Sequence, residues 1–84
     1  MFVEIITPEK TLFSGDVRLI QVPGSKTPFV MLEHHAPIIS LLDKGFIKII
    51  RKDDKEEYFE IAGGFVENKK NKIVALVELP EQAQ

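Results

Sequence analysis

The feature that most constrains the fold is a supply of β-branched apolar side chains in short runs, separated by glycine and proline. The 84 residues include 10 Ile and 7 Val, against 7 Leu and 4 Ala. β-Branched side chains lose rotamer freedom in a helix and pack well on a pleated sheet. Because no segment has a convincing amphipathic helical period, the sequence predicts an all-β fold.

Turn residues divide the chain into short extended segments. Apolar or alternating patterns predict strands over residues 2–7, 17–22, 29–32, 38–42, 46–51 and 73–77. The runs 29–32 and 38–42 are continuously apolar, which is typical of short strands buried on both faces. Turn signals recur roughly every 8–12 residues, a spacing that indicates a sandwich or barrel.

Two polar segments and one glycine pair mark the other connections. Residues 51–57 and 68–71 are rich in charge or Asn and are expected to form hairpin loops. Residues 58–66 form a longer extended stretch that Gly63 and Gly64 interrupt. A glycine pair within a strand pattern indicates a bulge or a close approach of two backbones.

Length and charge limit the classes of protein to which the chain can belong. The length allows one domain, expected over residues 1–79 and followed by a tail at 80–84. The net charge of −2 argues against a generally basic nucleic-acid binder, and cysteine is absent. No apolar stretch reaches the ~20 residues of a membrane span, and the N-terminus lacks the pattern of a signal peptide.

The candidate catalytic and metal-binding patterns are weak. His34 and His35 are adjacent, so in an extended segment they point to opposite faces and seldom reach one ion. Residues 24–27 (Gly-Ser-Lys-Thr) resemble the end of a phosphate-binding loop but lack its upstream glycine and the following helix. Ser14, Ser25 and Ser40 have no nucleophile motif. The sequence therefore predicts no enzyme, metal or cofactor.

A small barrel that binds single-stranded nucleic acid is the alternative function. Phe46, Lys48 and Ile50 would share one strand face, and a basic loop would contain Lys69, Lys70 and Lys72. Aromatic and lysine side chains in such an arrangement bind single strands. Nearby acidic residues dilute both clusters, so this function stays the second choice.

The order of the turn motifs resembles a known family. The motifs are Thr7-Pro8-Glu9-Lys10, Phe13-Ser14-Gly15-Asp16, Val22-Pro23-Gly24, His35-Ala36-Pro37, Lys44-Gly45-Phe46-Ile47 and Gly63-Gly64-Phe65-Val66. From Phe2 to Glu78 the chain resembles the N-terminal domain of the epsilon subunit of F-type ATP synthase, called delta in mitochondria. This resemblance implies a flattened two-layer sandwich of about ten short, mainly antiparallel strands. It also implies a non-catalytic role in the rotating central stalk.

The resemblance further implies partners and contact residues. Thr7 and Ser40 match positions that face the gamma subunit, and the residues expected to lie near the c-ring are Ser25, Lys26, Thr27, Pro28 and His35. The glycines expected at turns or bulges are Gly15, Gly24, Gly45, Gly63 and Gly64. The chain is expected to act as one copy within a hetero-oligomeric complex on the cytoplasmic face of a bacterial membrane, without inserting into it.

The sequence departs from the family pattern at three places. The family usually has Pro-Gly where Glu33 and His34 stand, so His34 either needs no positive φ or tolerates one. The family tends to have glycine at positions 27 and 30, where this chain has Thr27 and Val30. At position 28 it tends to have a polar or acidic residue, and Pro28 stands there instead, so a c-ring contact at this position is not charge-based. Many members continue into two C-terminal helices that inhibit ATP hydrolysis. If Gln84 is the natural end, inhibition by that route is lost.

Overall fold

The computed structural model describes residues 1–81, which form eight strands. They are β1 (Phe2–Ile6), β2 (Thr11–Val22), β3 (Phe29–Leu32), β4 (Ile38–Leu42), β5 (Gly45–Arg51), β6 (Glu56–Ile61), β7 (Gly63–Lys69) and β8 (Lys72–Glu78). The prediction of an all-β fold is confirmed. Within the described residues there is no helix that could cross a membrane. The tail predicted over 80–84 falls mostly outside the described residues.

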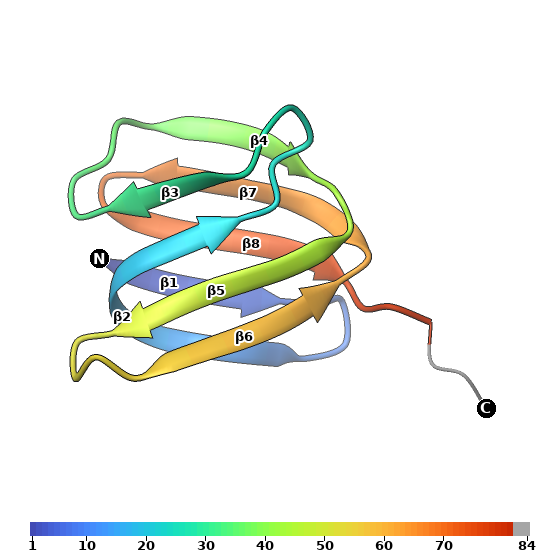
Figure 1. Ribbon diagram of the computed structural model, residues 1–84, viewed down its shortest axis with the longest axis horizontal. Helices are drawn as coiled ribbons and strands as arrows, with labels where there is room; N and C mark the ends of the chain where they lie inside the picture. Colours follow the sequence, from blue (N-terminus) through green and yellow to red (C-terminus); the bar gives the residue numbers. More distant parts are fainter. Residues whose placement is uncertain (82–84) are drawn as a thin grey trace.

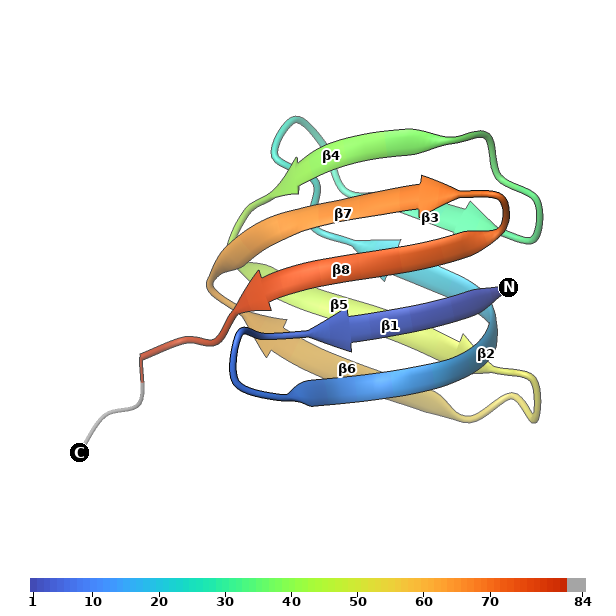
Figure 2. The same ribbon diagram turned by 180° about the vertical axis from the view of Figure 1, so that it is seen from behind.

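The strands form two packed layers (Figures 1 and 2). The first sheet has the order β4-β7-β8-β1 and ends on the first half of β2. The second sheet contains β3, the second half of β2, β5 and β6. All these pairs are antiparallel except β1 with β8. The molecule measures 40 × 27 × 20 Å, which confirms the flattened sandwich.

Strand β2 belongs to both layers, and residues 1–81 contain eight strands where the resemblance implied about ten. Its residues Thr11 to Asp16 pair with β1, and its residues from Val17 onward pair with β5. A register irregularity between Val17 and Leu19 lets the strand turn from one sheet into the other. The sequence predicts a strand only from residue 17, because Ser14-Gly15-Asp16 has the composition of a turn.

The core is built from the inward-facing residues of both sheets. In the first sheet, Val3 and Ile5 of β1 lie beside alternate residues of β8 and are fully buried. In the second sheet, Ile47 and Ile49 of β5 are also fully buried. This period of two is the one that the strand geometry requires.

The expectation that residues 29–32 and 38–42 are buried on both faces is wrong. Val30 and Leu32 of β3 are exposed, and Ile39 and Leu41 of β4 are 72% and 69% exposed. Both strands lie at a sheet edge, and only one face of each points into the sandwich. A continuous apolar run cannot distinguish a doubly buried strand from an edge strand with an uncovered face.

The glycine pair lies where the chain crosses between layers. Residues 58–66 are not one extended stretch: β6 ends at Ile61 in the second sheet, and β7 begins at Gly63 in the first. Gly64 has φ 146°, and a Cβ there would lie 2.2 Å from the carbonyl oxygen of Leu76. The predicted close approach of two backbones is therefore present at Gly64.

Candidate functional site

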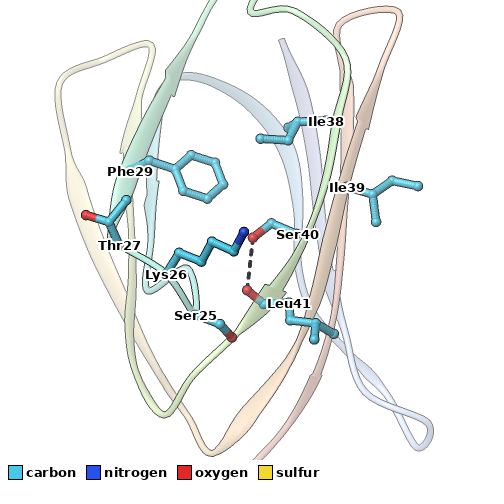
Figure 3. A pocket seen from close by; sticks show the side chains of 8 residues that line it. All are labelled: Ser25, Lys26, Thr27, Phe29, Ile38, Ile39, Ser40 and Leu41. Atoms are coloured by element: carbon cyan, nitrogen blue, oxygen red, sulfur yellow. Dashed lines mark hydrogen bonds between the residues drawn. The ribbon is translucent and has the colours of Figure 1, made fainter.

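The free edges of β3 and β4 lie on the same side of the sandwich (Figure 1). An open groove lies there, between β4 and the segment that leads into β3. We call it the edge groove. It has a volume of about 440 Å³ and is lined by Ser25, Lys26, Thr27, Phe29, Ile38, Ile39, Ser40 and Leu41. Figure 3 shows these side chains on the two walls of the groove, with β4 on one side and residues 25–29 on the other.

One end of the edge groove is closed by main-chain hydrogen bonds. The N–H of Ser25 donates to the carbonyl of Leu41 (2.9 Å), and the N–H of Asp43 donates to the carbonyl of Pro23 (2.8 Å). These bonds make Gly24 and Leu42 an isolated antiparallel bridge. The short segment around Gly24 therefore covers the end of the β4 edge and leaves its middle open.

The side chains in the edge groove combine apolar surface with one cation. Phe29 and Ile38 are half-buried and pack against the core. Lys26 is the charged side chain among the lining residues, and its side chain extends toward Ser40 in Figure 3. The hydroxyl of Ser40 donates to the carbonyl of Leu41 (3.0 Å).

A second uncovered feature is an apolar row across the outer face of the first sheet. Four apolar residues lie side by side on neighbouring strands, in the order Leu41 (β4), Phe65 (β7), Leu76 (β8) and Ile6 (β1). We call these four residues the apolar row. Leu41 and Phe65 are exposed, whereas Leu76 and Ile6 are half-buried. Such a contiguous apolar surface is typical of a docking site.

The structure brings together some of the predicted contact residues and separates others. Ser40, predicted to face gamma, lines the same groove as Ser25, Lys26 and Thr27, which were predicted to face the c-ring. Pro28 is exposed in the segment that leads into β3. His35 precedes β4, and Asn68 Nδ2 donates a hydrogen bond to its carbonyl (3.1 Å). Gly24 pairs with Leu42 at the other end of β4, so the length of this strand separates His35 from the closed end of the groove.

Thr7 lies apart from the groove and shapes a turn. Its hydroxyl oxygen accepts hydrogen bonds from the N–H groups of Glu9 (3.2 Å) and Lys10 (3.0 Å), and the residue is buried. This turn connects β1 to β2. Of the five predicted structural glycines, Gly24 lies in the bridge, Gly45 begins β5, and Gly15 lies inside β2 opposite Val3.

A polar cluster that the sequence did not predict lies at the other end of the molecule. Glu33 pairs with the buried α-amino group of Met1, with Lys52 Nζ (3.3 Å) and with Asn71 Nδ2 (2.9 Å). We call these four residues the Glu33 cluster. The hydrogen bond from Asn71, followed by that from the amino group, lowers the pKa of Glu33 to about 2. Asn71 Oδ1 also accepts the N–H of His34, which has φ 63°. His34 thus adopts a positive φ, one of the two outcomes that the sequence left open.

The residues of the alternative functions are arranged unfavourably for them. Residues 24–27 lead into β3 and not into a helix, so no helix N-terminus faces a phosphate there. Residues 1–81 contain no group of three or more potential metal ligands. Phe46 is opposite Glu60, and Lys48 Nζ lies 4.0 Å from the Glu56 carboxylate. These acidic neighbours disfavour a polyanion on this strand face.

Comparison with known proteins identifies the family. Residues 1–83 match the family described as ATP synthase, Delta/Epsilon chain, beta-sandwich domain. The chain belongs to this family. The predicted resemblance is thereby confirmed, and the open surfaces described above are those of an ATP synthase delta/epsilon-type sandwich.

Individual relatives agree with this assignment. The "ATP synthase epsilon chain" of Chlorobaculum tepidum is 39% identical over 75 residues, which cover 89% of this chain and 85% of the relative. That of Protochlamydia amoebophila is 40% identical over 80 residues, but the chain spans only 54% of its length. In a cryo-EM structure of the Euglena gracilis mitochondrial ATP synthase, a chain superposes with a TM-score of 0.83 at 16% identity, over 89% of this chain and 48% of that one. This last match shows a shared fold.

Proposed function

We propose that the protein is a non-catalytic subunit of the central stalk of a proton-translocating F-type ATP synthase. In this function it docks the gamma subunit onto the c-ring, at the cytoplasmic face of a bacterial membrane, so that both rotate together. The observation that carries the proposal is the apolar row of Leu41, Phe65, Leu76 and Ile6, an uncovered surface on a chain of this family. A lasting partner would remove this surface from water.

The two partners would use different surfaces. Gamma would cover the apolar row, because an apolar core is typical of a permanent subunit interface. Ser40, also expected to face gamma, lies on the other face of β4 and lines the edge groove. The exposed tip at residues 25–28 offers two hydroxyls, one ammonium group and a proline, which suits the polar loops of a c-ring. The close-packed sandwich between these surfaces resists deformation under torque.

A binding assay with purified gamma tests the proposal. We expect the full chain to form a one-to-one complex with gamma at micromolar concentration, measured by calorimetry and size-exclusion chromatography. Leu41→Asp should weaken this complex by at least about tenfold, or about 1.4 kcal/mol, because a charge would be placed in the interface. Tyr58→Asp is the matched control, since Tyr58 is also exposed but lies on the second sheet. Absence of a complex with the unmodified chain would contradict the proposal.

A further inference from the structure

We infer that the edge groove is a strand-addition site, which binds one extended segment of a partner subunit as an additional strand along β4. The inference rests on the proposed function, since it assumes that the chain works within a complex. It adds a mode of binding and a chemical description of the bound segment.

The first argument is the direction of the main-chain groups. Successive residues of a strand direct their N–H and C=O groups to opposite sides. The C=O of Leu41 and the N–H of Asp43 bond to the segment around Gly24, on the side away from β7. The N–H and C=O of Ile39 and the N–H of Leu41 therefore face this side as well. Within residues 1–81, no strand pairs with them there.

The second argument is that the middle of the β4 edge carries no charge, proline or bulge of the kind that commonly protects an edge strand. Its sequence, Ile-Ile-Ser-Leu-Leu, contains no charge and no proline, and its pairing with β7 runs without a bulge. Natural edges are usually blocked by such features, because an unprotected edge pairs with other chains. In this chain the segment around Gly24 already uses one end of the edge for antiparallel pairing. A bound segment would continue that pairing toward Ile39.

The side chains of the groove describe the bound segment. Phe29 and Ile38 offer a half-buried apolar surface between the walls, so an inward-pointing side chain of the segment should be apolar. Lys26 supplies positive charge, so an acidic residue of the segment should lie beside it. In strand addition, main-chain hydrogen bonds supply affinity and alternate side chains supply specificity.

The shape of the groove favours a single extended segment over a second copy of this chain. Residues 25–29 form a wall opposite β4, so the open space is a slot bounded on two sides (Figure 3). A single extended segment could enter such a slot from its open side. A second folded copy would have to bring its own β4 into the slot together with its own wall.

Hydrogen exchange tests the inference on the unmodified protein. We expect the amides of Ile39 and Leu41 to exchange at least tenfold more slowly in the intact ATP synthase than in the isolated chain. The amide of Ile49 should be protected in both states, because Ile49 is fully buried and β5 is paired with β2 on one side and β6 on the other. Protection of Ile39 that appears in the isolated chain and rises with its concentration would indicate a second copy and would overturn the inference.

Two substitutions separate main-chain pairing from side-chain packing. Ile39→Pro removes an N–H that β7 does not use, so the fold should persist while binding to the complex weakens at least tenfold. Ile39→Thr keeps both the N–H and the β-branched shape, and should bind as the unmodified chain does. Lys26→Glu should weaken binding, whereas Lys44→Glu, outside the groove, should not. If Ile39→Pro fails to fold, the exchange measurement on the unmodified protein decides.

The results distinguish this inference from the proposed function. A chain that joins the complex without protection of Ile39 and Leu41, or an Ile39→Pro variant that folds and binds normally, overturns only the strand-addition site. A chain that joins no complex at all overturns the proposed function and this inference together.

Discussion

The carboxylate of Glu33 forms an ion pair with the α-amino group of Met1, which is almost completely buried. Glu33 follows the end of β3, and Met1 precedes β1, so this pair links the two sheets at one end of the sandwich. Asn71, from the hairpin between β7 and β8, and Lys52, from the hairpin between β5 and β6, bind the same carboxylate. One side chain thus connects four segments.

This arrangement predicts a loss of stability in acid. The folded pKa of Glu33 is about 2, below its ordinary 4.5, so its contribution to stability is present above pH 4.5 and is lost as pH falls toward 2. Glu33→Gln should lower the urea midpoint at pH 7, and the difference from the unmodified protein should shrink between pH 4.5 and 2. Glu60→Gln, on the exposed face of β6, is the control. A difference that does not change over this range would contradict the prediction.

Gly64 should tolerate no side chain. A Cβ would lie 2.2 Å from the carbonyl oxygen of Leu76, and its φ of 146° is unfavourable for other residues. We expect Gly64→Ala to lower the free energy of unfolding by more than about 2 kcal/mol, measured by urea denaturation. In Gly15→Ala the new Cβ would lie 3.4 Å from the nearest ring atom of Phe13, so this control should cost less than about 1 kcal/mol. If both substitutions lower the free energy of unfolding equally, the close approach of two backbones at Gly64 does not exclude a side chain.

Two isoleucine substitutions should separate core from edge. Ile49→Ala removes a fully buried side chain and should cost about 2–5 kcal/mol, because it leaves a cavity. Ile39→Ala removes a side chain that is 72% exposed and should change stability by less than about 0.5 kcal/mol. Chemical denaturation of both variants provides the measurement. A large loss for Ile39→Ala in the isolated chain would mean that β4 is covered there.

The phenol of Tyr58 should report on its neighbour Glu56. Its hydroxyl donates to the Glu56 carboxylate (2.9 Å), and this bond raises the pKa of Tyr58 above its ordinary value of 10.0. In Glu56→Gln the negative charge is lost, so the pKa of Tyr58 should fall toward 10.0. Because Tyr58 is the only tyrosine, ultraviolet titration measures it directly. An unchanged titration curve would show that the hydrogen bond does not persist in solution.

Sequence reasoning predicts the fold class well because composition and turn residues act locally. The preference of Ile and Val for strands, and the hairpin loops expected at residues 51–57 and 68–71, depend on nearby residues alone. The assignment of strands to layers depends on distant pairing, so the long β2 and the crossing at Ala62 could not be predicted. The same limit applies to the Glu33 cluster, whose members come from four separated segments.

For the candidate site, one local signal was present but was interpreted differently. The uncharged run at residues 38–42 was expected to be buried on both faces, and it is an edge strand with exposed Ile39 and Leu41. An apolar run looks the same whether its own chain or another molecule covers it. The resemblance to the family gave Ser40 and residues 25–27 as contact positions, and the structure brings these residues into one groove.

The continuity of β2 through both sheets has a mechanical consequence. Sliding one layer over the other would have to stretch a covalent backbone or break its pairings with β1 and β5 at the same time. A twisting load applied to one broad face therefore passes to the opposite face through peptide bonds as well as through packed side chains. Deleting a single residue near Val17 would misalign one of the two ladders and soften this connection.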